Sequence, residues 1–274
     1  MMFVIVLVCC YNIGMNWALR RQFFVIFSFI VLAALIGFMM IYPEFHKPPT
    51  CSDGIQNGTE TGIDCGGSCA NACLDQVDPV SILWARSFEV VPGRYNAVAY
   101  LVNHNNNDAA ENVSYRFRFA DANNVYIGKR EGTTSIPPSG YFAVFAPAID
   151  VGNSVPVYTT FEFTETPNWL QVSQDKIDQL KVLTSNIQLT NEDTSPRLSA
   201  TIKNTSLFTI PDVNVVAILY DKSGNAVSVS NTYMDQLSPL ETTGVGFTWP
   251  EAFGSGIVAK ELIPMYDIFS VKLQ

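Results

Sequence analysis

The segment between residues 51 and 73 holds the densest set of potentially reactive side chains in this sequence. Its four cysteines are Cys51, Cys65, Cys69 and Cys73, and no cysteine follows residue 73. An even number of cysteines packed into one short segment is typical of a disulfide framework formed in an oxidising compartment. We therefore expect two local disulfides, and the sequence leaves all three pairings open.

The same segment offers oxygen ligands for a metal ion. Asp53, Asn57, Glu60 and Asp64 follow one another at spacings of three or four residues, with glycines between them. Calcium takes about six to eight oxygen ligands, so these four side chains are a candidate calcium site. The alternative is that they are solvated turn residues, because the EF-hand spacing is missing. Zinc binding by the cysteines is a third interpretation, although paired Cys-x2-Cys knuckles are absent and oxidation competes.

This segment resembles a short module of prokaryotic surface proteins. The residues that carry the resemblance follow the pattern C-x-DGIxNxxETGxDCGG-x-C and lie within 51–73. The resemblance implies a stalk or spacer in an exported protein and implies no catalytic activity.

An apolar run precedes the module and would hold it at a membrane. Residues 23–42 contain no charge and no proline, and a helix of this length spans the hydrocarbon core of a bilayer. Arg20 and Arg21 lie at its amino end, and the next basic residue is Lys47. The positive-inside rule then predicts a cytoplasmic amino end and an extracellular carboxyl end. A cleaved signal peptide is less favoured, because the run is long and lacks an Ala-x-Ala site.

The residues before this run leave two interpretations open. Residues 1–19 are apolar enough to form a second span at the lower length limit, which would make a hairpin with a turn at the two arginines. We prefer Met15 as an alternative start, because it gives a short basic amino terminus directly before the anchor.

The charge balance excludes one class of partner. The net charge is −9, and all 25 acidic residues follow the anchor. Such a surface repels phosphate backbones, so we expect no nucleic-acid partner.

The rest of the chain repeats its pattern at an offset near 100 residues. The segments that align are 81–90 with 181–189, 97–103 with 198–204, 111–121 with 211–221, and 136–140 with 237–241. Residues 113–119 alternate apolar and polar side chains as a half-buried strand does, and residues 213–220 form the continuous apolar run of a deeper strand. Turn residues recur between such runs, which favours an immunoglobulin-like sandwich of about seven strands in each repeat.

The fold class that we predict is all-β: two tandem immunoglobulin-like β-sandwiches preceded by one transmembrane α-helix and a small disulfide-rich segment. The expected parts are 1–22 as cytoplasmic amino terminus, 23–42 as transmembrane helix, 43–77 as juxtamembrane linker and cysteine module, 78–168 as the first sandwich, 169–180 as a linker, and 181–274 as the second sandwich. Residues 169–183 are also the one helical candidate outside the anchor.

A second resemblance lies in the repeats. The second repeat carries Pro211-Asp-Val-Asn-Val-Val-Ala-Ile-Leu-Tyr-Asp221 and then Leu237-Ser-Pro-Leu-Glu-Thr242. These residues are similar to the FxLYD-like family of exported sandwich domains. The first repeat departs from the pattern, with Phe-Ala-Asp-Ala-Asn-Asn at 119–124. The resemblance implies an accessory or binding module and no catalytic residues.

Catalytic signatures are missing, and modification signals are few. His46 and His104 have no nucleophile and carboxylate beside them in sequence, so we interpret both as solvated loop residues. Asn57, Asn112 and Asn204 begin Asn-x-Ser/Thr sequons and are candidate glycosylation sites. We expect the aromatic residues to be core rather than a carbohydrate platform. They are Phe117, Phe119, Tyr141, Phe142, Phe145, Tyr220, Phe247 and Trp249.

Together these patterns predict a single-pass surface protein without enzymatic activity, whose tandem domains bind a partner or support the envelope. The expected partners are the lipid bilayer and a protein or glycan outside the membrane, with no cofactor other than the calcium considered above. The alternative is an accessory subunit of a membrane-embedded secretion, pilus or transport complex.

Overall fold

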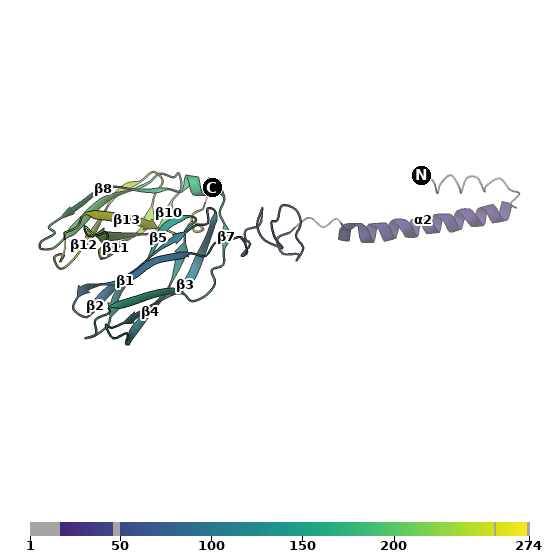
Figure 1. Cartoon of the computed structure of the whole chain (residues 1–274). Coiled ribbons are helices and arrows are strands. Elements are labelled where there is room, and N and C mark those ends of the chain that lie inside the picture. Colours follow the sequence, from purple (N-terminus) through teal and green to yellow (C-terminus); the bar gives the residue numbers. More distant parts are fainter. Residues whose placement is uncertain (1–16, 46–49, 255, 273–274) are drawn as a thin grey trace. The chain divides into compact units, whose positions relative to one another are not determined.

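A computed structural model of the chain describes residues 17–45, 50–254 and 256–272 (Figure 1). The chain divides into two compact units, Met1–Thr50 and Cys51–Gln274. The all-β prediction with one amino-terminal apolar helix and a disulfide-bonded cysteine segment is confirmed.

The first unit contains helix α2, Trp17–Phe45. It begins before the predicted residue 23, so part of the expected amino-terminal segment is helical. Its stretch Leu19–Tyr42 is long and apolar enough to cross a membrane. The hydroxyl of Ser28 donates to the carbonyl of Phe24 at 2.8 Å, so this polar group is satisfied within the helix. The alternative start Met15 lies outside the described residues.

The second unit contains two β-sandwiches, which we call lobe 1 and lobe 2. The strands of lobe 1 are β1 (Ser81–Val91), β2 (Arg94–Asn103), β3 (Asp108–Ala120), β4 (Tyr126–Ile136), β5 (Gly140–Asp150), β6 (Tyr158–Phe163) and β7 (Leu170–Gln171). Those of lobe 2 are β8 (Val182–Thr190), β9 (Arg197–Asn204), β10 (Ile210–Tyr220), β11 (Ala226–Leu237), β12 (Thr242–Thr248) and β13 (Ala259–Met265). Helix α3, Gln174–Gln179, lies between the lobes in sequence.

Both lobes have the same topology. The sheets of lobe 1 have the strand orders β1-β2-β5 and β4-β3-β6, with β7 added beside β3. Those of lobe 2 have the orders β8-β9-β12 and β11-β10-β13, which are the equivalent strands in the same places. Three of the aligned segment pairs lie on equivalent strands, and the fourth pair, 136–140 and 237–241, lies at the turns after β4 and β11. A duplicated origin for the lobes stays a prediction.

Side-chain alternation explains the strands of lobe 1. Phe117 and Phe119 on β3 point into the sandwich and are fully buried, whereas Arg116 and Arg118 point out and pair with Glu162 at 3.2 and 2.8 Å. The predicted half-buried strand is therefore present. The expectation that the listed aromatic residues are core is wrong for Tyr141, which is 62% exposed.

The two lobes pack face to face. Val98 on β2 and Ala143 on β5 contact a cluster that includes Val216 and Ile218 on β10. The sheets of β2 and β10 therefore have a buried face on each side, one inside their own sandwich and one against the other lobe. This double burial explains why residues 213–220 are apolar without interruption.

A buried asparagine ends the second strand of each lobe. In lobe 1 the side-chain nitrogen of Asn103 donates to the carbonyls of Asp108 and Pro137 at 2.8 and 2.9 Å. In lobe 2 the nitrogen of Asn204 donates to the carbonyls of Phe208, Leu237 and Ser238 at 2.8, 3.2 and 2.9 Å. Each amide therefore ties its strand to the start of the next strand and to a turn in the other sheet.

One carboxylate links the lobes. Glu261 on β13 accepts hydrogen bonds from the hydroxyls of Tyr100 in lobe 1 and Tyr220 in lobe 2, at 2.8 and 2.7 Å. Burial and these bonds to Glu261 raise the pKa of both tyrosines.

The segment 169–180 is more than the expected linker. Trp169 is buried in the core of lobe 1, whereas Val172 and Leu180 are buried in the core of lobe 2. Only Gln174–Gln179 is helical, with the hydroxyl of Ser173 capping the Lys176 amide at 3.3 Å. The segment joins the two cores because its apolar residues face both.

We predict that Asn204→Leu destabilises the second unit, Cys51–Gln274, by about 3 kcal/mol or more. Leucine has a similar size but leaves three carbonyls without their donor, one of them on the fully buried Leu237. Urea unfolding followed by circular dichroism would measure the free energy of unfolding. The exposed Asn153→Leu is the control, and a loss no larger than that of the control would contradict the clamp role of Asn204.

We predict that stability falls as the pH rises above about 10. The folded state keeps protons on Tyr100 and Tyr220 that the unfolded chain releases, because both pKa values are raised on folding. The contribution of these two tyrosines to the free energy of unfolding is fully present below the pKa of tyrosine in the unfolded chain. It is lost as the pH rises from there through the higher pKa of the folded state. Tyr220→Phe should make the fall in urea midpoint shallower, and an unchanged slope in this variant would count against the Glu261 link.

Candidate functional site

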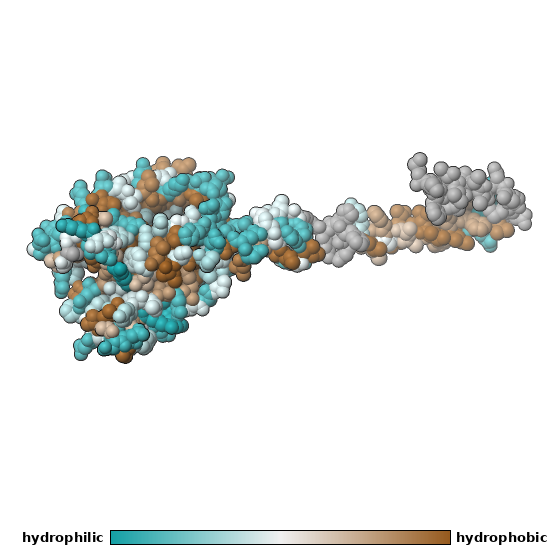
Figure 2. Space-filling model, viewed as in Figure 1, coloured by the Kyte–Doolittle hydropathy of each residue, from teal (hydrophilic) through white to brown (hydrophobic). Residues whose placement is uncertain are grey.

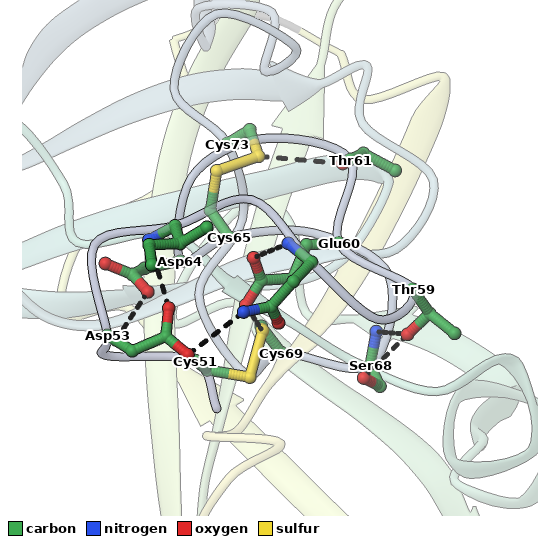
Figure 3. Close-up of a disulfide and its surroundings, with 12 residues drawn as sticks. Cys51, Asp53, Thr59, Glu60, Thr61, Asp64, Cys65, Ser68, Cys69 and Cys73 are labelled. Atoms are coloured by element: carbon green, nitrogen blue, oxygen red, sulfur yellow. Dashed lines mark hydrogen bonds between the residues drawn. A yellow bond between two sulfur atoms is a disulfide. The ribbon is translucent and has the colours of Figure 1, made fainter. Parts of the chain in front are cut away.

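The cysteine module, residues 51–73, is held by two interlaced disulfides. Cys51 pairs with Cys69 and Cys65 pairs with Cys73, so each bridge encloses one end of the other (Figure 3). The prediction of two local disulfides is borne out by this geometry, and the structure selects one of the three pairings. Because the segment has little apolar core of its own, these bridges provide much of its order.

The acidic residues of the module serve its own backbone. The carboxylate of Asp64 accepts hydrogen bonds from the amides of Asp53 and Gly54 at 2.9 Å each. Asp53 accepts from the amide of Ile55 at 3.0 Å, and Glu60 accepts from the amide of Asn57 at 3.1 Å. These side chains replace the strand partners that so short a segment lacks.

Two adjacent glycines close the module. Gly66 and Gly67 both have positive φ, at 72° and 62°, a conformation that other residues rarely adopt. A β-carbon on Gly67 would also collide with the carbonyl of Thr59. The Gly-Gly pair after Cys65 is thus required by the path of the backbone.

The calcium prediction gains no support from this geometry and remains untested. Among the described residues, the one group of three His, Cys, Asp or Glu ligand atoms within 4.8 Å of one another is Cys51, Glu60 and Cys69. Its two sulfur atoms are already bonded to each other. The oxygens of Asp53 and Asp64 do not join such a group. Asn57 contributes a buried side-chain oxygen without a partner, while its nitrogen donates to Asp53 at 3.0 Å.

The module is fastened to lobe 1 through β7. The amide of Ala72 donates to the carbonyl of Trp169 at 3.0 Å, and the amide of Gln171 donates to the carbonyl of Ala70 at 2.7 Å. Ala72 itself is buried in the core of lobe 1 beside Trp169. The module therefore continues the strand pairing of lobe 1 and packs against its core, so it is not a separate domain.

The three sequons lie in different environments. Asn112 is exposed, at a left-handed position of β3 with φ 53°. Asn57 is half-buried and bonded within the module. Asn204 is 0% exposed and uses its nitrogen inside lobe 2, so a glycan on Asn204 is incompatible with the folded lobe. Burial in the final fold is a property that the sequon pattern does not encode.

One pair of potentially reactive residues was missed in the sequence. The hydroxyl oxygen of Ser81 lies 3.3 Å from Nε2 of His104. In the part of the chain that the structure describes, no carboxylate hydrogen-bonds the other ring nitrogen of His104. The pair is also at the surface, so it lacks the orienting acid and the enclosure of a catalytic triad. His46 lies outside the described residues.

Comparisons with known proteins assign no family. No family model matches the chain, and no curated protein matches it. Among solved structures, a transglutaminase of red sea bream has a TM-score of 0.23 at 9% identity, covering 70% of this chain and 31% of its own. A β-glucuronidase of Bacteroides uniformis has a TM-score of 0.19 at 14% identity, covering 64% and 22%. The chain thus spans less than a third of either protein, and likeness this distant supports no functional argument.

We predict that reduction of the disulfides speeds amide hydrogen exchange throughout residues 51–73 while β10 in lobe 2 stays protected. Each bridge contributes about 2.5 to 3 kcal/mol by loop closure, and the lobes have cores of their own. Hydrogen–deuterium exchange followed by mass spectrometry, with and without reductant, would measure the exchange rates. An equal loss of protection in β10 would contradict the expectation that the lobes stay folded without the disulfides.

Calcium added to the oxidised protein should leave this exchange unchanged, because the module's carboxylates already bind its amides. Slower exchange at residues 53–64 in calcium would instead establish the ion site.

Proposed function

We propose that this chain is a single-pass, membrane-anchored surface protein without catalytic activity, whose two lobes outside the membrane bind a partner or support the envelope. The observation that carries the proposal is helix α2, whose stretch Leu19–Tyr42 is apolar enough to span a bilayer and exposes its large side chains; Figure 2 shows the apolar colour along the face in view. Such a helix is unfavourable in water and suited to lipid, where its backbone groups are satisfied internally.

The ends of the helix fit the two bilayer interfaces. Trp17 at one end and Tyr42 at the other are exposed and stand 25 residues apart, which is about 38 Å along a helix. Aromatic rings prefer the interfacial zones at this separation. The guanidinium of Arg21 lies 5.7 Å from the ring centre of Trp17, which groups charge and ring at the amino end.

The orientation rests on two independent arguments. Arg20 and Arg21 favour an amino end on the cytoplasmic side. The two disulfides follow the helix, and disulfides persist in oxidising compartments, which lie on the opposite side. Both arguments support an extracellular carboxyl end.

The resemblances to the exported cysteine module and to the FxLYD-like family fit the same proposal. The motif residues Asp53, Glu60, Asp64 and the Gly-Gly pair all serve the module's own backbone. Residues with structural duties of this kind are what a spacer requires. Among the described residues, no carboxylate is hydrogen-bonded to the Ser81 and His104 pair, so this pair gives no support to an enzymatic role.

One observation favours the second candidate, an accessory subunit of a membrane-embedded secretion, pilus or transport complex. Lobe 1 has an apolar tip at the end of β3 that is remote from the cysteine module, formed around Ala120. Its exposed members are Val125, Tyr126, Val155, Val157 and Tyr158. Grouped apolar residues at a surface mark interaction sites. Recovery of a stoichiometric complex in mild detergent would favour this candidate over a free-standing surface protein.

We predict that a protease added outside bacterial spheroplasts removes a carboxyl-terminal epitope and leaves an amino-terminal epitope intact. Immunoblots of both epitopes would measure this. The double variant Arg20→Glu and Arg21→Glu should lower the correctly oriented fraction, whereas Lys222→Glu, far from the helix in sequence, should not. Protection of the carboxyl-terminal epitope in the unchanged protein would overturn the proposed topology.

A further inference from the structure

A groove runs between the lobes on both sides of the segment that ends β13. Two cavities of about 240 and 230 Å³ share Met265 and Tyr266 as a common wall. Each is large enough for a ring-sized group and smaller than a typical drug-sized pocket. We call the two together the interlobe groove. It exists only because the lobes pack face to face, since each cavity is lined from both lobes.

The first half of the groove is apolar and carries a fixed aromatic ring. Pro137, Pro138 and Pro264 line it together with Tyr141. The Tyr141 ring stacks on Tyr100 with centroids 5.5 Å apart and an angle of 2° between the planes. Glu261 holds the hydroxyl of Tyr100, and Tyr100 in turn supports the exposed ring of Tyr141. The Tyr141 side chain therefore loses little conformational entropy when a ligand packs on it.

The second half is polar and is lined from both lobes. Asn112 on β3 and Asp212 on β10 occupy aligned positions and share a left-handed backbone, with φ of 53° and 52°. Asp212 is held by the Tyr233 hydroxyl at 2.5 Å, and Asp267 accepts from the Phe269 amide at 2.9 Å. Thr133, Thr134 and Ser135 on β4 and Asn214 on β10 also line this half.

The charges of the groove select among ligands. No Lys, Arg or His is among the described residues that line the polar half, so anionic groups meet two carboxylates and a chain of net charge −9. The one cation that lines the apolar half, Lys181, lies 3.4 Å from the carboxylate of Asp178. The groove thus joins an aromatic and proline surface to fixed oxygen acceptors that suit neutral hydroxyl donors.

We propose that the interlobe groove binds a neutral oligosaccharide, with the apolar face of one sugar ring on Tyr141 and the hydroxyls of the next ring bonded to the polar half. Sugars combine apolar C–H faces with hydroxyl edges, which is the pairing that the two halves present. The proposal deepens the proposed function by naming its ligand class, and it depends on that function only for the location of the groove outside the membrane.

The test uses the full chain in lauryl dimethylamine oxide, a detergent without a sugar headgroup. Cellohexaose, chitohexaose, xylohexaose and mannohexaose are titrated in turn by calorimetry, with a polygalacturonate hexamer and a lysine-rich peptide as charged probes. We expect at least one neutral hexaose to bind with a Kd below about 1 mM, and neither charged probe to bind.

Matched variants locate the binding. Tyr141→Ala should weaken the hexaose that binds by at least about tenfold, whereas Tyr126→Ala should change it by less than about twofold. Tyr126 is the suitable control because it is 60% exposed, close to the 62% of Tyr141, and lies at the tip of lobe 1. Thr133→Val, on the polar half, should weaken binding by about threefold. Circular dichroism melts confirm that each variant is folded.

Three results would overturn the proposal. They are the absence of binding of every neutral hexaose up to about 5 mM, an equal loss in the Tyr126 and Tyr141 variants, and Tyr141-dependent binding of the lysine-rich peptide or the anionic hexamer alone. Binding to the purified chain does not depend on membrane orientation. A reversed topology would therefore refute the proposed function and leave the binding result standing, and absence of binding would leave the topology standing.

Discussion

The structure of the second unit depends on two sheets that are buried on both faces. β2 and β10 are the central strands of these sheets, and their side chains alternate between a sandwich core and the cluster between the lobes. A strand in this position cannot place a polar side chain in either direction without a partner. The apolar side chains of Val98, Val216 and Ile218 therefore help to hold the lobes together.

Polar groups fix the position of the lobes relative to each other, which apolar packing alone does not determine. Apolar faces can slide, because the hydrophobic effect is not directional. Glu261 accepts from one tyrosine of each lobe and so sets the register between them. Asn103 and Asn204 do the same within the lobes, since each binds carbonyls of another strand and of a turn. The shape of the interlobe groove is therefore fixed as well, because its walls come from both lobes.

Much of the fold could be predicted from the sequence, because its signals are local. The apolar run of α2, the alternation along β3 and the cysteine cluster each act over a few residues or turns. Contacts distant in sequence could not be predicted. Tyr141 has the same pattern as a core residue, yet it stacks on Tyr100, lines the interlobe groove and stays 62% exposed. The interlobe groove joins Asn112 to Asp212, and no local pattern records that meeting. The disulfide pairing depends likewise on the path between the cysteines.

The junction of the cysteine module with β7 has a mechanical consequence. Tension applied at residue 51 passes through the disulfide to Cys69 and bypasses the loop between them. It then enters lobe 1 at Ala72, whose backbone is bonded beside Trp169, and Trp169 leads along the chain into the core of lobe 2. A pull at residue 51 would thus reach the lobes without first extending the loop between Cys51 and Cys69, because the disulfide spans that loop.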